Sequence, residues 1–205
     1  MSPIEHIRQE DQKDATVEVA LFPIPGMVTF PGTTVPLHVF EPRYRRMIQD
    51  AVEEQRLVGI CHTVKVIRSA PDNQSPQEIL TSNQATYDPC QVFSAGYCNV
   101  ISETEDGRLY LEVDMVGRYQ LADEIQTLPY RKFLCRALPD TEDGEQDDPV
   151  LLELKHNITE ALIEIAGQRS EELSRLLSGE DWQQMPPAAF SFRLFNYIRI
   201  DPDIM

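Results

Sequence analysis

The chain has 205 residues, enough for one large domain or for one domain with an appendage. It carries 34 acidic against 18 basic residues, a formal net charge of −16 at pH 7. Because nucleic-acid binding depends on cations that neutralise phosphates, this balance argues against a DNA- or RNA-binding protein.

The first segments predict short strands rather than a membrane span. Residues 17–22 alternate apolar and polar side chains, as a half-buried strand does. Two further extended pieces are predicted at 27–30 and 35–40, on either side of a Pro31-Gly32 turn signal. The prolines within residues 19–40 would repeatedly break a membrane-spanning helix, so we predict no membrane segment.

The amino-terminal sequence and the cysteines do not indicate export. Residues 1–14 are polar and mixed in charge, unlike a signal or transit peptide. The four cysteines have neither CxxC spacing nor a nearby histidine pair, so they predict reduced thiols rather than disulfides or a zinc site. We therefore expect a cytoplasmic protein that holds no metal and no other cofactor.

One helix is predicted inside the β-rich part of the chain. Pro42 fits the first position of a helix. Apolar residues then follow at helical spacing, at Tyr44, Met47, Ile48, Ala51 and Val52. A β pattern returns at 57–66, a polar loop is predicted at 69–86, and strands are predicted throughout 91–137 with a hairpin turn at 106–107.

The last third of the chain predicts helices after an acidic break. Residues 140–147 have almost no apolar content, and we predict a linker there. The linker would join a β-rich domain at 15–139 to a helical bundle at 148–205. Apolar residues recur at helical spacing after Asp148, at Leu151, Leu154, Ile158, Leu162 and Ile165.

Three more helix starts are predicted within this bundle, at Ser170, Pro187 and Asp201. The fold class is therefore α+β, with the β-rich part first. Short strands, glycines and edge prolines favour a small, half-closed barrel over a flat sheet.

No catalytic motif is present in the sequence: it lacks a P-loop, a GxSxG elbow and an HExxH pair. His38 and Cys61 are candidates for a small-molecule pocket, although a structural histidine and a buried thiol are the simpler interpretations. Arg43, Arg45 and Arg46 crowd the start of the predicted helix, where the helix dipole disfavours cations. They either pair with acids of the chain or form a basic patch that faces a partner.

Two sequence blocks carry a family resemblance. The stretch LFPIPGMVTFPGTTVPLHVFEPRYRRMI resembles the opening of the N-terminal domain of Lon proteases. The stretch SAGYCNVISETEDGRLYLEVDMVGRYQL resembles a later pattern of that domain, with Gly96, Gly107, Gly117 and Arg118 at its marked positions. A third block, FSFRLFNYIRID, is similar to the segment before the last long helix of the family. The resemblance covers roughly residues 15–201.

The resemblance implies a PUA-like β pseudo-barrel with an inserted helix, followed by a small C-terminal helical bundle. In Lon proteases this region recognises or holds substrates and contributes to assembly, whereas separate ATPase and Ser–Lys protease domains perform the chemistry. The motifs of those domains are absent here, so we expect a stand-alone, non-catalytic member of the family.

The expected function is recognition of unfolded polypeptides or of a partner protein. Candidate contact residues are Phe30, Pro31, Arg43, Tyr44 and Arg118. One alternative is a small-molecule-binding protein that uses a pocket in or beside the barrel. Another is an RNA-binding PUA-like module, which the net charge of −16 disfavours.

Overall fold

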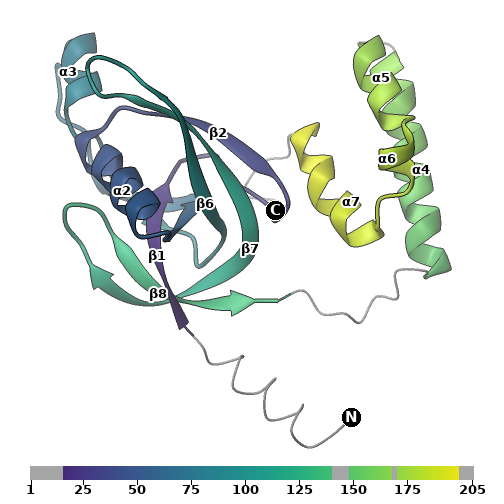
Figure 1. The fold of residues 1–205 in the computed structure, drawn as a ribbon, viewed down its shortest axis with the longest axis horizontal. Helices are drawn as coiled ribbons and strands as arrows, with labels where there is room; N and C mark the ends of the chain where they lie inside the picture. Colours follow the sequence, from purple (N-terminus) through teal and green to yellow (C-terminus); the bar gives the residue numbers. More distant parts are fainter. Residues whose placement is uncertain (1–15, 140–147, 168–169, 199–205) are drawn as a thin grey trace, which may run out of the picture. The chain divides into compact units, whose positions relative to one another are not determined.

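The computed structural model describes residues 16–139, 148–167 and 170–198, which belong to two compact units (Figure 1). We call residues 16–139 the barrel unit and residues 148–198 the helical unit. The predicted linker at 140–147 and the helix predicted to begin at Asp201 lie outside the described residues. Each unit has its own hydrophobic core.

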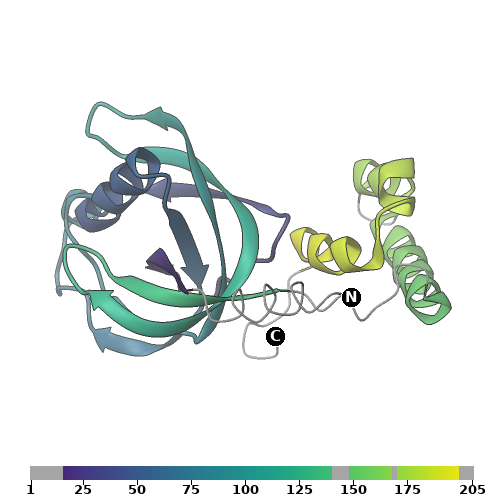
Figure 2. The ribbon, with the colours of Figure 1, turned by 60° about the horizontal axis from the view of Figure 1, so that its bottom comes forward.

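Six strands of the barrel unit form one sheet that curls into a ring (Figure 2). The strands are β1 (Thr16–Pro23), β2 (Thr34–Val39), β3 (Leu57–Cys61), β6 (Val92–Glu103), β7 (Leu109–Gln126) and β8 (Lys132–Leu138). Five of them close the ring in the order β7-β6-β3-β1-β8, because β8 pairs with both β1 and β7. β2 pairs with the first part of β7, and its Pro36 fits an edge strand.

Strands β1 and β3 are buried on both faces. Successive side chains of a strand point to opposite faces, and here each face meets a different apolar cluster. Ala20 and Ile60 belong to a cluster with helix α2 (Pro42–Glu53), whereas Leu21 and Cys61 belong to a cluster with β6 and β8. The two strands run parallel, and α2 lies between them in sequence. This arrangement explains their nearly unbroken apolar sequences.

Helix α2 packs through the apolar face that its sequence predicts, with one exception. Tyr44, Met47, Ile48 and Ala51 are buried, but Val52 is 45% exposed. The helix begins at Pro42, as predicted, because proline lacks the N–H that a first helical turn leaves unpaired.

The stretch 69–86 contains structure that the sequence prediction missed. Helix α3 (Pro76–Thr81) begins with a capping box, in which Ser75 and Glu78 exchange hydrogen bonds. Strand β5 (Thr86–Pro89) follows and pairs with β4 (Thr63–Arg68) in a separate two-stranded sheet. The Ser-x-x-Glu spacing was a readable signal for α3, whereas β5 depends on its partner strand.

The extended piece predicted at 27–30 is not a strand. Its backbone is held by side chains instead of a strand ladder, since Ser94 Oγ donates to the carbonyl of Thr29 over 2.6 Å. Thr29 Oγ1 in turn donates to the carbonyl of Ile60 over 3.3 Å. The β pattern predicted over 57–66 forms two strands, β3 and β4, with His62 between them.

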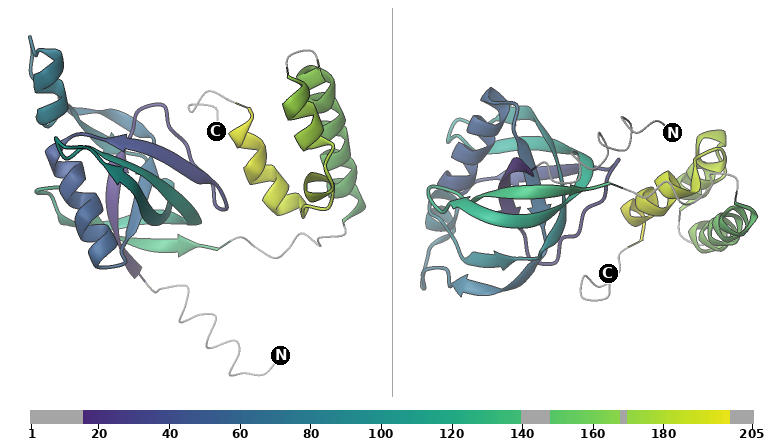
Figure 3. Two further views of the ribbon diagram at one scale, coloured as in Figure 1. Left: turned by 45° about the horizontal axis from the view of Figure 1, so that its top comes forward. Right: turned by 90° about the horizontal axis from the view of Figure 1, so that it is seen from below.

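The helical unit contains α4 (Pro149–Gly167), α5 (Glu171–Leu177), α6 (Glu180–Gln183) and α7 (Pro187–Arg193), followed by a 3₁₀ turn, η1 (Leu194–Asn196). Asp148 and Ser170 cap the first two helices through their side-chain oxygens, as predicted. Figure 3 shows α5 turning back along α4. The core of this unit is formed by Ala166, Leu177, Trp182, Met185 and Phe190.

The apolar residues that predict α4 do not all face this core. Leu151, Leu154, Ile158 and Ile165 are exposed, whereas Lys155, Thr159 and Ala166 are buried. The ammonium of Lys155 donates to the carbonyls of Gln183 and Met185, which close the turn after α6. These hydrogen bonds offset the cost of burying the Lys155 ammonium. The face of α4 that carries Lys155 therefore packs toward the core of the unit.

The predicted fold class is confirmed. The chain is an α+β protein with a curled β ring, an inserted helix and C-terminal helices. None of the helices in the described ranges is both long and apolar enough to span a membrane.

Gly96 lies where β6 and β7 come closest together. A Cβ atom at this position would lie 1.9 Å from the carbonyl oxygen of Asp114, beside a register shift in the β6–β7 ladder. We expect Gly96→Ala to lower the free energy of unfolding by about 3 kcal/mol, because the clash is with backbone that other strands hold in place. Urea denaturation followed by far-UV circular dichroism measures this.

The matched control is Gly117→Ala, on the neighbouring strand. Its Cβ would meet nothing closer than 3.4 Å, which is ordinary contact. The control should change stability by less than about 1 kcal/mol. Equal effects of the two substitutions would contradict the close approach at Gly96.

Candidate functional site

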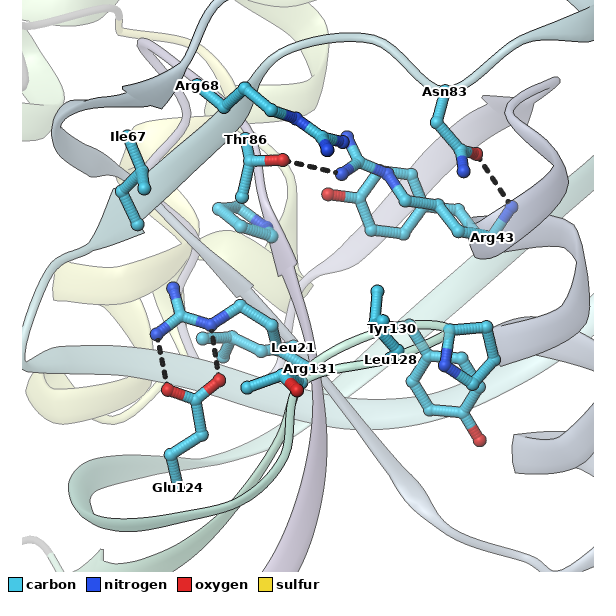
Figure 4. Close-up of a pocket in the computed structure, with 14 residues that line it drawn as sticks. Leu21, Arg43, Ile67, Arg68, Asn83, Thr86, Glu124, Leu128, Tyr130 and Arg131 are labelled. Carbon is cyan, nitrogen blue, oxygen red and sulfur yellow. Dashed lines mark hydrogen bonds and ion pairs between the residues drawn. The ribbon is translucent and has the colours of Figure 1, made fainter.

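A cavity of about 340 Å³ opens in the barrel unit beside the start of α2 (Figure 4). It is lined by β1, α2, the end of β4, the segment 83–86 and the turn that joins β7 to β8. The lining residues are Leu21, Pro23, Arg43, Tyr44, Ile67, Arg68, Asn83, Thr86, Glu124, Thr127, Leu128, Pro129, Tyr130 and Arg131. Among the residues that the structure describes, no group of histidine, cysteine or acidic side chains could hold a metal ion.

Arg43 organises one wall of the cavity. Its guanidinium, only 9% exposed, donates to Glu41 Oε2, to Thr86 Oγ1 over 3.0 Å and to the carbonyl of Ala85 over 2.7 Å. Its backbone N–H donates to Asn83 Oδ1 over 3.1 Å, which caps the first turn of α2. A cation at a helix start is therefore stable here because the Glu41 carboxylate and several oxygen acceptors surround it.

The Glu41 carboxylate completes this arrangement from the other side. Its Oε2 atom accepts from the backbone N–H of Gln84 over 2.9 Å as well as from Arg43. The side chains of Glu41 and Arg43, which flank the first residue of α2, thus both hold the segment 83–86. We call this set of bonds the Arg43 clamp.

The opposite wall contains a second ion pair. Arg131 donates from Nε and Nη2 to the two carboxylate oxygens of Glu124, over 2.8 and 2.9 Å. Its Nη1 donates to the carbonyl of Tyr87 on β5 over 3.1 Å. The hydrogen bond with Glu124 raises the pKa of Arg131 above its usual range. Because the pair is bidentate, the charge of Glu124 is neutralised within the wall.

Two tyrosines supply the aromatic part of the lining. The ring of Tyr44 stacks on Phe22 with centroids 4.1 Å apart, and the guanidinium of Arg43 lies 4.5 Å from the centroid of Tyr44. Burial raises the pKa of Tyr44 above its usual range. The hydroxyl of Tyr130 donates to Asp50 Oδ2 over 2.8 Å and so ties the β7–β8 turn to α2.

Arg68 differs from the other two arginines of the cavity. Its side chain is exposed and has no hydrogen bond or ion pair within the described ranges. In Figure 4 its side chain extends toward Arg43 and Asn83 across the opening of the cavity. Its positive charge is therefore available to a ligand.

The five predicted contact residues lie in two places. Arg43 and Tyr44 line the cavity, whereas Phe30, Pro31 and Arg118 are not among its lining residues. The Pro31-Gly32 turn is attached to β7, since the N–H of Gly32 donates to the carbonyl of Met115 over 2.8 Å. Arg118 lies further along β7 and faces Ser94 across the β6–β7 ladder.

The three arginines at the start of α2 lie in different surroundings and do not form one basic patch. Arg43 is buried in the clamp, and Arg46 forms an exposed ion pair with Asp50 over 2.8 Å. The guanidinium of Arg45 covers Gly107 in the β6–β7 turn, where it would lie 1.8 Å from an added Cβ. The positive φ of Gly107, 78°, fits the hairpin turn predicted there.

Neither candidate for pocket chemistry lies at the cavity. His38 stacks on Tyr110 with ring centroids 4.4 Å apart. Cys61 is 1% exposed, and burial raises the pKa of its thiol well above its usual range. A thiol in that state is not nucleophilic near neutral pH.

Comparison with known proteins identifies the family. Residues 18–200 match the profile of the ATP-dependent protease La (LON) substrate-binding domain. The chain belongs to this family. The Lon substrate-binding domain thus accounts for most of the chain, and no ATPase or protease domain is matched.

The relatives agree with this membership. The chain is 26% identical over 186 residues to "Lon protease 1" of Herpetosiphon aurantiacus, a match that covers 89% of this chain and 21% of that protein. It thus spans about a fifth of the length of this curated relative.

The fold is similar to that of a solved Lon N-terminal domain. The N-terminal domain of the Mycobacterium avium complex Lon protease superposes with a TM-score of 0.59 at 13% identity, over 88% of this chain and 82% of that one. A Lon N-terminal domain protein from Xanthomonas campestris gives a TM-score of 0.46 at 18% identity, over 88% of this chain and 98% of that one.

The sequence analysis missed most of this site. Asn83, Thr86, Glu124 and Arg131 come from segments that were predicted as a polar loop or as plain strands, and Arg68 lies between two predicted segments. No spacing in the sequence relates them to Arg43, because the ring topology and the Arg43 clamp bring them together. The sequence contains one local signal. Arg43 lies beside Glu41 at a helix start, where an arginine needs hydrogen-bond acceptors.

Removing Arg43 tests the clamp. We expect Arg43→Met to lower the free energy of unfolding by about 3 kcal/mol, because it leaves a nearly buried Glu41 carboxylate without its cation. The control is Lys65→Met, where the Lys65 side chain is 70% exposed and its partner Asp88 is 40% exposed, and it should cost less than about 1 kcal/mol. Urea denaturation measures both, and equal losses would contradict a structural role of Arg43.

The Tyr130–Asp50 bond predicts a dependence on alkaline pH. Burial and the hydrogen bond to Asp50 raise the pKa of Tyr130 to about 12 from its ordinary value of 10.0. The stabilisation is fully present below about pH 10 and is lost as the pH rises to about 12, since only the unfolded chain releases this proton early. Stability of Tyr130→Phe, measured by urea denaturation, should fall less steeply over this range. Identical slopes for the two proteins would contradict the prediction.

Proposed function

We propose that this protein is a non-catalytic recognition module that binds unfolded polypeptides or an extended segment of a partner protein. The observation that carries the proposal is the match of residues 18–200 to a substrate-binding domain whose family acts on polypeptides. We propose this role whether the chain acts alone or together with a protease.

An exposed strand beside the cavity supports this function. Within the described part of the chain, β4 pairs with β5 alone, so its outer edge has unpaired backbone groups. Val64, Val66 and Ile67 on this strand are 66, 53 and 54% exposed. An extended peptide can add to such an edge through its main chain and place apolar side chains beside it.

A small-molecule ligand is the second candidate, and the cavity itself supports it. Its volume of about 340 Å³ is near the lower end of the range of ligand pockets. A thermal-shift screen of metabolites separates the two candidates, since a ligand that binds only the folded form raises the melting temperature. RNA binding is not proposed, because the net charge of −16 repels phosphates.

Binding of an unfolded protein tests the main proposal. Fluorescence anisotropy with labelled, reduced and carboxymethylated α-lactalbumin should show saturable binding, whereas the native protein should not bind. We expect Ile67→Asp to weaken binding about tenfold, because it places a charge where an apolar contact is needed.

The matched control is Ile101→Asp, on β6. Ile101 is 61% exposed, similar to Ile67, and it does not line the cavity. The control should leave the affinity within about twofold of the starting protein. Absence of saturable binding, or equal losses in the two variants, would refute the proposal.

A further inference from the structure

One wall of the cavity consists of hydrogen-bond donors. Arg43, Arg68, Asn83 and Thr86 lie together along it, as Figure 4 shows. We call these four residues the donor wall. In a chain with a net charge of −16, two guanidinium groups at one small opening are a local departure from the overall charge.

The residues of this wall that bond to Arg43 still have hydrogen-bond donors available to a ligand. Thr86 Oγ1 accepts from Arg43 Nη1, so the hydroxyl proton of Thr86 remains to be donated. Asn83 uses its carbonyl oxygen to accept from the N–H of Arg43, which leaves its amide N–H groups for another acceptor. Arg68 adds a complete guanidinium that has no partner in the described part of the chain.

The other walls favour an anion with an apolar body. Leu128 lines the cavity and is 80% exposed, so its side chain is accessible to a ligand. Because Arg131 holds both oxygens of Glu124, that carboxylate does not oppose an anion at the donor wall. A carboxylate matches a guanidinium fork, and an apolar side chain matches Leu128.

The position of β4 indicates what carries the carboxylate. Arg68 is the last residue of β4, whose outer edge pairs with no strand in the described ranges and whose Val64 and Val66 are exposed. A chain that ends in the cavity can therefore continue in an extended conformation along β4. A free small acid would leave that edge unused.

We propose that this cavity binds the carboxyl-terminal residue of a polypeptide. Its carboxylate binds the donor wall, chiefly through Arg68, and its side chain packs against Leu128. This inference rests on the proposed function and specifies which part of a polypeptide is recognised.

Two forms of one peptide test the inference with the full chain. An N-terminally labelled pentapeptide that ends in leucine is compared as the free acid and as the amide by fluorescence anisotropy. The free acid should bind about tenfold more tightly, because amidation removes the charge that a guanidinium recognises. In Arg68→Gln this preference should disappear.

Arg136→Gln is the control, because Arg136 is an exposed arginine on β8 that does not line the cavity. It should retain the preference for the free acid. A preference that survives in Arg68→Gln, or that is lost equally in Arg136→Gln, would overturn the assignment.

A competition experiment distinguishes a polypeptide end from a free acid. N-acetyl-leucine carries the carboxylate and the side chain without the residues that would lie along β4. It should compete about tenfold more weakly than the pentapeptide, and equal affinity would overturn the polypeptide assignment. If the protein binds unfolded α-lactalbumin but does not distinguish the two peptides, the proposed function stands and this inference fails.

Discussion

The Arg43 guanidinium joins the start of α2 to the segment 83–86, and the shape of the site depends on that connection. Thr86, which accepts one of its hydrogen bonds, is the first residue of β5. β5 pairs with β4, and β4 ends at Arg68, so the clamp determines where the exposed arginine lies. Arg43 is buried and Glu41 is 14% exposed, which makes the loss of this ion pair costly.

The clamp is effective because the ring beneath it is rigid. β1 and β3 have apolar clusters on both faces, and one of these clusters includes the buried face of α2. β7 adds a second constraint, since along its 18 residues it pairs with β6 and also with β2 at its start and with β8 at its end. The bulge opposite Gly96 lets β7 change direction between these partners. A cavity bordered by such elements is largely preformed, which reduces the cost of ordering on binding.

Local signals predicted the elements that carry their own chemistry. Pro42 and the apolar spacing after it predicted α2, and the Asp106-Gly107 pair predicted the turn between β6 and β7. Elements that depend on distant partners were missed or misassigned. Residues 27–30 were predicted as a strand but are held by Ser94 and Ile60, and β5 exists only because β4 lies beside it. In the helical unit, Lys155 faces the core because carbonyl groups distant in sequence accept hydrogen bonds from its ammonium.

The sequence by itself determined the family, the α+β class, and two of the residues that line the cavity, Arg43 and Tyr44. These follow from short-range patterns: turn residues, apolar periodicity, and motifs that keep their spacing along the chain. Only the tertiary structure decided that Arg43 forms a clamp and that the Arg68 side chain has no partner among the described residues. That distinction depends on burial and on hydrogen-bond partners about 40 residues away, which side-chain type alone does not specify.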